Sequence, residues 1–207
     1  MTSGLSNYAM EKALNYKLRN TAWTPPSTIY AGLDSAISNA ANGGTEISAG
    51  GYQRQAGSMG SFTSRQVSND ISNTWTPSET WPEAVGFRLW DAPTGGNALG
   101  WGALSPKPTP STIAPFTLAV GEMVITCDAT YDNLSTYALG ELLKLIFDNT
   151  AGSSWSGGIY AHLVNVRSSI AFSGGTAVSG TGYPGGQAAS FAACASGRNY
   201  LASDITY

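Results

Sequence analysis

The residues that most often carry out chemistry are few in this chain and do not form a catalytic pattern. His162 is the only histidine, so two histidines cannot combine in a metal site. No G-x-S-x-G motif supports a nucleophilic serine. The nearest pairs of carboxylates are interpreted as loop charges rather than as a glycosidase couple. These pairs are Glu79 with Glu83, and Asp128 with Asp132. We therefore expect no enzyme activity, no bound metal and no cofactor.

A glycine-rich segment, GGTEISAGGYQRQ at residues 43–55, could in principle surround a phosphate group. It lacks the Lys-Ser/Thr ending of a phosphate-binding loop, and no helical pattern follows it. We predict tight β-turns that bring Glu46 and Arg54 close enough for an ion pair. The two cysteines, Cys127 and Cys194, are too few and too far apart for a disulfide scaffold, and we interpret both as small buried hydrophobic residues.

Tryptophans raise the possibility of carbohydrate binding, because aromatic faces stack on sugar rings. Trp90 and Trp101 flank a predicted hairpin at positions typical of a core, whereas Trp75 and Trp81 lie in a proline-rich loop. We favour a role in the core and in interfaces for these residues. A carbohydrate-binding or receptor-binding module remains the alternative.

The surface is expected to be polar but weakly charged. Charged residues make up 11% of the chain, against roughly 25% in an ordinary soluble domain. The net charge is −3 and the basic residues do not cluster, so binding to nucleic acid or to an anionic membrane is not expected. Neither a membrane-spanning stretch nor a secretory signal is recognisable. We expect a protein made and kept in a cytoplasm, unless it leaves as part of something larger.

The sequence contains an internal repeat. Residues 5–21, LSNYAMEKALNYKLRNT, align without a gap with residues 134–150, LSTYALGELLKLIFDNT, with seven identities in 17 positions. Four further blocks follow in the same order in both copies: IYAGL with IYAHL, GGTEIS with GGTAVS, GGYQRQA with GYPGGQA, and VSNDI with LASDI. A fixed order of similar blocks indicates a duplicated unit. We predict a complete module over residues 1–132 and a second, truncated copy over residues 133–207.

Each copy is expected to begin with an amphipathic helix. Ser6 and Ser135 stand at the position of an N-cap residue, where the hydroxyl accepts from a free backbone N–H of the first turn. Apolar residues then recur every four positions on one side of each helix. These are Met10, Leu14 and Leu18 in the first copy, and Leu139, Leu143 and Phe147 in the second.

After the first helix, the pattern is typical of β-structure. Ile29, Ala31 and Leu33 alternate with more polar residues, as in a half-buried strand. Further strands are predicted around residues 46–48, 52–56, 67–71, 84–90 and 123–127, with a hairpin at DAPTGGNALGWGAL. Residues 105–115 hold four prolines and are expected to be extended. The predicted fold class is mainly β (α+β): in each copy, an N-terminal amphipathic helix precedes an antiparallel β-sandwich or barrel-like module.

The second copy has no counterpart of residues 75–132. Its sheet is expected to expose unpaired edges. The alternatives are packing on the first copy, pairing with a strand of a neighbouring subunit, and disorder at the tail, and we favour the pairing with another subunit. The second helix is apolar nearly all round, so we expect it to lie between the two copies or against another subunit. The proposed interface residues are Leu142, Leu145, Ile146, Trp155, Ile205 and Tyr207.

The first copy resembles a widespread family of tailed-bacteriophage virion proteins. The resemblance covers nearly all of residues 5–128 and is carried by LSNYAMEKALNYKLRNTAWTPPSTIYAGL, GGTEISAGGYQRQA and VGFRLWDAPTGGNALGWGALSPKPTPSTIAPFTLAVGEMVITCD. The family pattern reads LSxYxxNKLLxHxLRxTxYTxPxTxYVxL, then GGTEVSGGSYxRQ, then xGIFDAATGGNLLxYGxL and a final strand. Such proteins are usually described as tail fibre, minor tail or structural proteins.

The resemblance implies a virion protein that is assembled in the cytoplasm of the host bacterium. The expected partners are further copies of the chain and other phage structural proteins of the tail, portal vertex or capsid, with a host surface glycan as the alternative. Two placements are expected to compete, a tail-fibre or tail-associated adaptor and a capsid-decorating protein. The chain has no heptads or collagen-like triplets for an elongated shaft, so we expect an adaptor or base within a fibre.

Overall fold

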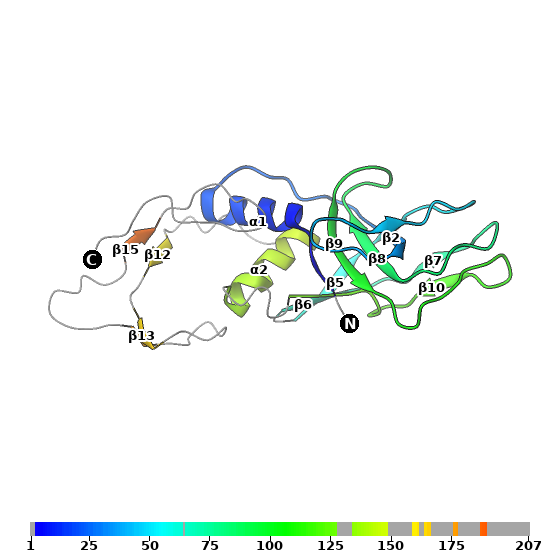
Figure 1. Cartoon of the computed structure of the whole chain (residues 1–207). Helices are drawn as coiled ribbons and strands as arrows, with labels where there is room; N and C mark the ends of the chain where they lie inside the picture. Colours follow the sequence, from blue (N-terminus) through cyan, green and yellow to red (C-terminus); the bar gives the residue numbers. More distant parts are fainter. Residues whose placement is uncertain are drawn as a thin grey trace.

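The computed structural model describes residues 3–63, 65–127 and 134–148, together with the backbone of four short strands further along the chain. Antiparallel strands dominate, and two helices, α1 and α2, lie together beside them (Figure 1). This part of the chain is mainly β with several antiparallel sheets, which confirms the predicted class in outline.

The largest sheet has β2 near its centre. Its strands, in spatial order, are β1 (Ser3–Leu5), β9 (Ala98–Ala103), β8 (Gly86–Trp90), β2 (Ile29–Ala36) and β3 (Thr45–Glu46), and β4 (Gln55–Gly57) also pairs with β2. One edge of β2 pairs with β8 from Tyr30 to Asp34. The other edge pairs first with β4 and then with β3. The predicted hairpin is the pair formed by β8 and β9, which confirms the turn signal in the sequence.

A second sheet and a two-stranded ribbon complete the β-structure of the first module. The sheet contains β11 (Val124–Thr126), β6 (Gln66–Asn69) and β5 (Met59–Thr63), and the ribbon contains β7 (Asn73–Trp75) and β10 (Phe116–Leu118). The backbone N–H of Thr126 donates to the hydroxyl of Ser3 at 3.0 Å. This bond joins the end of the second sheet to the first strand of the large sheet.

Both predicted helices form, and their caps are those expected from the sequence. They are α1 (Asn7–Arg19) and α2 (Thr136–Phe147). The hydroxyl of Ser6 accepts from the backbone N–H of Ala9 at 3.0 Å, and the hydroxyl of Ser135 accepts from that of Ala138 at 3.2 Å. Asn20 ends α1 in the left-handed conformation, with φ 52°, which asparagine tolerates better than most residues.

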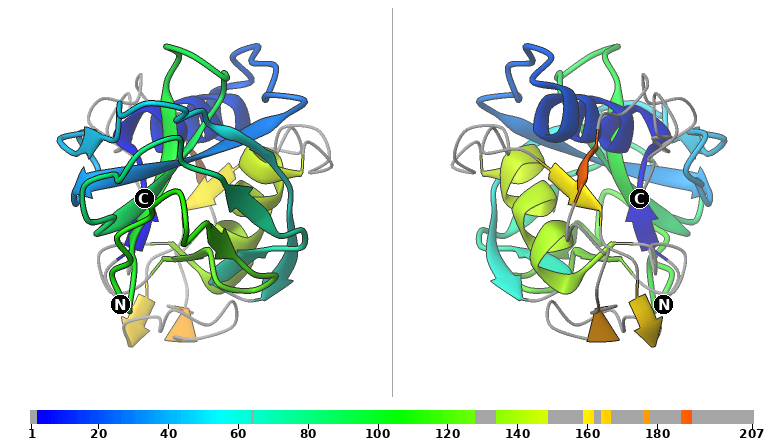
Figure 2. Two further views of the ribbon diagram at one scale, coloured as in Figure 1. Left: turned by 90° about the vertical axis from the view of Figure 1, so that its right-hand side faces the viewer. Right: turned by 90° about the vertical axis from the view of Figure 1, so that its left-hand side faces the viewer.

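Helix α2 is buried between α1 and the β5–β6 part of the second sheet (Figure 2). Its apolar side chains belong to the same continuous core as those of α1 and of the strands. Lys17 on α1 is almost completely buried and lies 3.8 Å from the carboxylate of Glu141 on α2. The buried side chains of α2 are Leu139, Leu142, Leu143, Leu145, Ile146 and Phe147.

Four short strands follow α2 in two antiparallel pairs. Strand β12 (Ile159–Ala161) pairs with β15 (Gln187–Ala189), and β13 (Val164–Val166) pairs with β14 (Thr176–Ala177).

Strand β2 differs from its predicted alternation. Ile29, Ala31 and Leu33 are buried as expected, but Gly32 and Asp34 on the opposite face are buried as well. The alternation predicted a polar, half-exposed face there. That face is covered because side chains from β3, β8 and the segment before β4 gather over it.

Three tryptophans and the cysteine of the first module lie where a core role requires them. Trp75, Trp81 and Trp90 are at most 6% exposed, as expected for the core, whereas Trp101 is only half-buried. Cys127 is buried, as predicted. Cys194 lies outside the described residues.

Candidate functional site

The predicted ion pair between Glu46 and Arg54 forms, and it is bidentate. Arg54 Nη2 lies 2.7 Å from Glu46 Oε2, and Arg54 Nε lies 2.8 Å from Oε1. The hydroxyl of Tyr52 also donates to Glu46 Oε1, at 2.8 Å. Two parallel charge-assisted bonds fix the guanidinium plane as well as its position.

A second ion pair lies beside the first. Nε and Nη2 of Arg88 donate to Oδ1 of Asp34 at 2.9 and 2.7 Å, and the Asp34 side chain has no exposure to solvent. Arg88 Nη1 donates to Asn42 Oδ1 at 2.6 Å. A buried pair of this kind fixes geometry more than it adds stability, because desolvation offsets much of the attraction.

Both arginines lie over the ring of Trp90. The guanidinium carbon of Arg54 is 3.6 Å from the ring centroid, and that of Arg88 is 4.6 Å from it. Contacts at these distances are cation–π interactions. We call Asp34, Glu46, Arg54, Arg88 and Trp90 the arginine cluster.

Gly32 provides the space that the arginine cluster occupies. A Cβ atom at this position would lie 2.8 Å from Glu46 Oε1, 2.9 Å from the Tyr52 hydroxyl and 3.1 Å from Trp90 Nε1. Only a residue without a side chain fits beneath these groups. The glycine therefore belongs to the site because it leaves this space open.

Burial and the arginines shift the two carboxyl pKa values in opposite directions. Burial raises the pKa of Asp34 to about 6, against the partial opposition of Arg88. Its Oδ2 atom is buried without a hydrogen-bond partner, which is consistent with a carboxyl that ionises reluctantly. Burial would also raise the pKa of Glu46, but hydrogen bonds from Arg54 and Tyr52 outweigh it and lower that pKa. The pKa of Tyr52 is raised by burial and by the nearby Glu46 charge.

The arginine cluster holds the backbone of an exposed turn. Arg54 Nη1 donates to the carbonyl oxygens of Ala92 and Gly95 at 2.9 and 2.7 Å. Across the same turn, the carboxylate of Asp91 accepts from the backbone and the side-chain amide of Asn97, at 2.6 and 2.8 Å. Residues 93–97 are exposed, so this is a rigid turn at the surface.

Arg88 binds a second exposed loop. Arg88 contacts Asn42, which has φ 62° and lies in the loop of residues 39–44. Within this loop, Oδ1 of Asn39 accepts from the backbone N–H groups of Ala41 and Gly43 at 2.9 and 3.1 Å. We call residues 39–44 and 91–97 the locked loops. The arginine cluster therefore fixes the positions of two surface loops through hydrogen bonds from buried side chains.

The predicted interface residues of α2 are buried within this chain and do not form an exposed surface. Leu142, Leu145 and Ile146 are at most 2% exposed and pack within this chain. They pack against α1 and the strands before it in the same core, and contact of α2 with the rest of the second copy or with another subunit stays a prediction. Trp155, Ile205 and Tyr207, as well as His162, lie outside the described residues.

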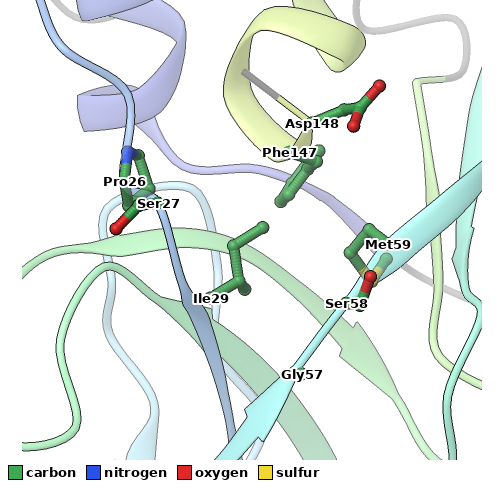
Figure 3. A pocket seen from close by; sticks show the side chains of 8 residues that line it. All are labelled: Pro26, Ser27, Ile29, Gly57, Ser58, Met59, Phe147 and Asp148. Atoms are coloured by element: carbon green, nitrogen blue, oxygen red, sulfur yellow. The ribbon is translucent and has the colours of Figure 1, made fainter. Parts of the chain in front are cut away.

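A small cavity of about 160 Å³ lies at the end of α2. Phe147 and Asp148 of α2 and Ile29 of β2 line it, and the Phe147 side chain points toward Ile29 (Figure 3). The other lining residues are Pro26, Ser27, Gly57, Ser58 and Met59. Its volume is below the roughly 300–1,000 Å³ typical of small-molecule sites, so it fits a few water molecules better than an organic ligand.

In the part of the chain that the structure describes, no group of three or more His, Cys, Asp and Glu side chains could hold a metal ion. No helix there is both long enough and apolar enough to cross a membrane.

The sequence predicted one of the two ion pairs of the arginine cluster. Glu46 and Arg54 are eight residues apart and were predicted together, whereas Asp34 and Arg88 are 54 residues apart. Two features of the sequence could have indicated the other pair. Gly32 and Asp34 lie on one face of an otherwise apolar strand, and Arg88 lies inside the apolar strand GFRLW. Either feature indicates a buried polar contact.

Comparisons with known proteins identify the first module. No curated protein matches the chain. A family model described as podophage GP4 fiber I protein gp80 matches residues 4–126 of the 207. The match runs from β1 to the end of β11 and includes the arginine cluster and both locked loops. Because it covers more than half of the chain, the chain belongs to the family of the podophage GP4 fiber I protein gp80.

Proposed function

We propose that this chain is a structural protein of a bacteriophage tail, located in the virion, and that it joins other virion proteins as an adaptor at a fibre. It acts by binding rather than by catalysis. The observation that carries this proposal is the extent of the family match, which includes every strand from β1 to β11 and helix α1. The match therefore covers α1 and the whole run of strands from β1 to β11, not an isolated motif.

The locked loops are the proposed docking surface of this adaptor. They hold no lysine, arginine or glutamate, and Asp91 is engaged within its own turn. A surface whose backbone is fixed before binding loses little conformational entropy when a partner docks. The arginine cluster, which fixes both loops, supports binding by preorganised shape more than by charge.

Particle composition tests the proposed location. An antibody against the chain is applied to purified particles in immunogold electron microscopy, and mass spectrometry counts its copies. We expect label at the tail and about three to a dozen copies per particle, in line with cyclic symmetry at the tail. Label over the head with hundreds of copies would instead indicate a capsid-decorating protein.

A paired substitution tests the docking surface. Thr94→Arg places bulk and charge on the exposed turn of residues 91–97 without touching the arginine cluster. Thr112→Arg makes the same change on another exposed turn, at residues 111–114, which is outside the locked loops. We expect the first variant to fold but to be lost from particles, and the second to be incorporated normally. Equal incorporation of both variants would rule out the locked loops as the docking surface.

The alternative of a receptor-binding or carbohydrate-binding module has weaker support. Trp75, Trp81 and Trp90 are buried, so their rings cannot stack on a sugar. A glycan array with the full chain separates the two functions. Reproducible binding to one class of glycan would favour recognition over assembly.

A further inference from the structure

We propose that Asn42 and Gly43 form a site of spontaneous deamidation, and that the hydrogen bonds of their loop keep this site unreactive while the chain is folded. Asparagine is a thermolabile residue. A following glycine leaves its own backbone nitrogen open to the asparagine side chain, because glycine has no Cβ atom. The sequence contains one asparagine followed by glycine, and it lies in the locked loop of residues 39–44.

The reaction needs no reagent other than water. The backbone nitrogen of Gly43 loses its proton to hydroxide and attacks Cγ of Asn42. A bond forms between these two atoms, the bond from Cγ to Nδ2 breaks, and Nδ2 leaves as ammonia with a proton from water. Water then opens the cyclic imide. Opening at Cγ gives aspartate, whereas opening at the main-chain carbonyl carbon gives isoaspartate, whose main chain gains a carbon atom.

The site is open to solvent and its surroundings are neutral. Asn42 and Gly43 are both exposed, so water and hydroxide reach them and ammonia can leave. The loop has the sequence NAANGG and contains no charged residue. Deamidation would therefore introduce a carboxylate into an uncharged surface loop.

The fold requires glycine at position 43. A Cβ atom there would lie 2.9 Å from Nδ2 and 3.3 Å from Oδ1 of Asn39. The first of these contacts is too short for any real side chain, so the amide group of Asn39 lies directly against Gly43. A larger residue, which would shield the backbone nitrogen, does not fit, and the reactive pair is a consequence of how the loop packs.

The first part of the protection acts on the attacking nitrogen. The N–H of Gly43 donates to Oδ1 of Asn39 at 3.1 Å, and the same oxygen accepts from Ala41 at 2.9 Å. The N–H of Asn42 donates to the main-chain carbonyl of Asn39 at 2.9 Å. The nitrogen of Gly43 can attack only after it loses the proton that it donates to Asn39. The reaction must therefore break this hydrogen bond, which adds to its barrier.

The second part acts on the carbonyl that is attacked. Arg88 Nη1 donates to Oδ1 of Asn42 at 2.6 Å, and Asp34 fixes Arg88 in turn. This bond polarises the side-chain carbonyl, which by itself favours attack, but it also holds the side chain in one orientation. Attack within a chain is fast only from a near-attack geometry. We expect the loss of freedom to outweigh the polarisation.

Comparison of the folded and the unfolded chain tests the protection. The full chain is incubated in mildly alkaline buffer with isotope-labelled water, with and without denaturing urea. Peptide mapping by mass spectrometry then measures aspartate and isoaspartate at position 42. We expect labelled product in the unfolded chain and a rate about tenfold or more lower in the folded chain. No product in the unfolded chain would show that the pair is not a deamidation site, and equal rates would show that the fold does not protect it.

Three variants test whether Asn39 provides the protection. Asn39→Ala removes the acceptor of the Gly43 N–H, whereas Asn39→Asp keeps an acceptor oxygen. Asn97→Ala makes the same change in the other locked loop, where it removes the bonds to Asp91 from the Asn97 side chain. We expect the folded Asn39→Ala chain to deamidate at Asn42 about tenfold faster, and the other two variants to keep the natural rate.

Urea unfolding of each variant gives its unfolded fraction, and the rate of the unfolded chain is known from the first comparison. The contribution of global unfolding can therefore be subtracted. An unchanged rate in Asn39→Ala, or an equal increase in Asn97→Ala, would overturn the assignment to Asn39. These rates concern the loop alone, so a failure of the particle experiments would refute the adaptor role and leave the protected site, and the reverse result would refute only the protected site.

Discussion

At the scale of single residues, Gly32 leaves the space into which side chains of the arginine cluster pack. Gly32→Ala would place a Cβ atom within 3 Å of Glu46 Oε1 and of the Tyr52 hydroxyl. We expect the free energy of unfolding to fall by about 1–3 kcal/mol, as for other overpacked sites, measured by urea denaturation. Gly57→Ala on the adjacent strand is the matched control, because its Cβ atom would have 3.7 Å of clearance. A control change within about 0.5 kcal/mol is expected, and equal losses in the two variants would contradict the role of Gly32.

The buried carboxyl of Asp34 predicts a pH dependence of stability. Its pKa in the folded state is about 6, above the ordinary value of 3.8 for an aspartate, so the folded state binds the proton more tightly than the unfolded state. The resulting stability is fully present below about pH 4 and is lost as the pH rises through 6, by roughly 3 kcal/mol from the size of the shift.

The measurement is urea unfolding from pH 4 to 7 for the natural chain and for Asp34→Asn, which does not titrate. The lowered pKa of Glu46 acts in the opposite direction, because its contribution is lost as the pH falls. Comparison of the two chains isolates Asp34, since both retain Glu46. We expect the decline between pH 4 and 7 to disappear in Asp34→Asn, and a decline of equal size in both chains would refute the assignment to Asp34.

At the scale of elements, local sequence signals were sufficient to predict the two helices and the β8–β9 hairpin. Ser6 and Ser135 cap helices that begin one residue later, and the turn DAPTGGN joins two strands. Strand β1 was not predicted because its three residues, Ser3–Leu5, pair with β9 almost a hundred residues further along the chain. The same limit applies to Asp34 and Arg88, whose contact depends on the pairing of β2 with β8. Pairing over long sequence separations is not encoded in a local pattern.

The pairing of β12 with β15 predicts a specific cross-link. Tyr160 and Ala188 lie directly opposite each other in β12 and β15, at a separation that suits a disulfide. Tyr160→Cys with Ala188→Cys, in a chain carrying Cys194→Ser, is expected to form this bond on mild oxidation, as read by peptide mapping. Tyr160→Cys with Ala189→Cys is the control, because a shift of one residue turns the side chains to opposite faces. Equal cross-linking of both pairs would show that the register is not fixed.

At the scale of the whole molecule, the boundary between the sequence copies differs from the boundary of the core. The family match ends at residue 126, and the repeat predicts a module ending at residue 132. Helix α2, which begins the second copy, nevertheless buries six apolar side chains in the core that α1 and the first-module strands share. Residues 3–127 therefore depend on α2 for part of their interior, so the core does not end at the predicted boundary between the copies.

Two truncated chains test this dependence. Residues 1–132 lack α2, whereas residues 1–148 retain it, and the two chains share everything that the family model matches. Removal of α2 uncovers the sides of α1, β5 and β6 that it contacts, at a cost on the order of 2 kcal/mol for each large side chain left unburied. We expect residues 1–148 to unfold cooperatively in urea, and residues 1–132 to unfold at a clearly lower concentration and to bind a hydrophobic dye. Equal stability of the two chains would show that the first module is complete without α2 and that the predicted boundary at residue 132 is also the boundary of the core.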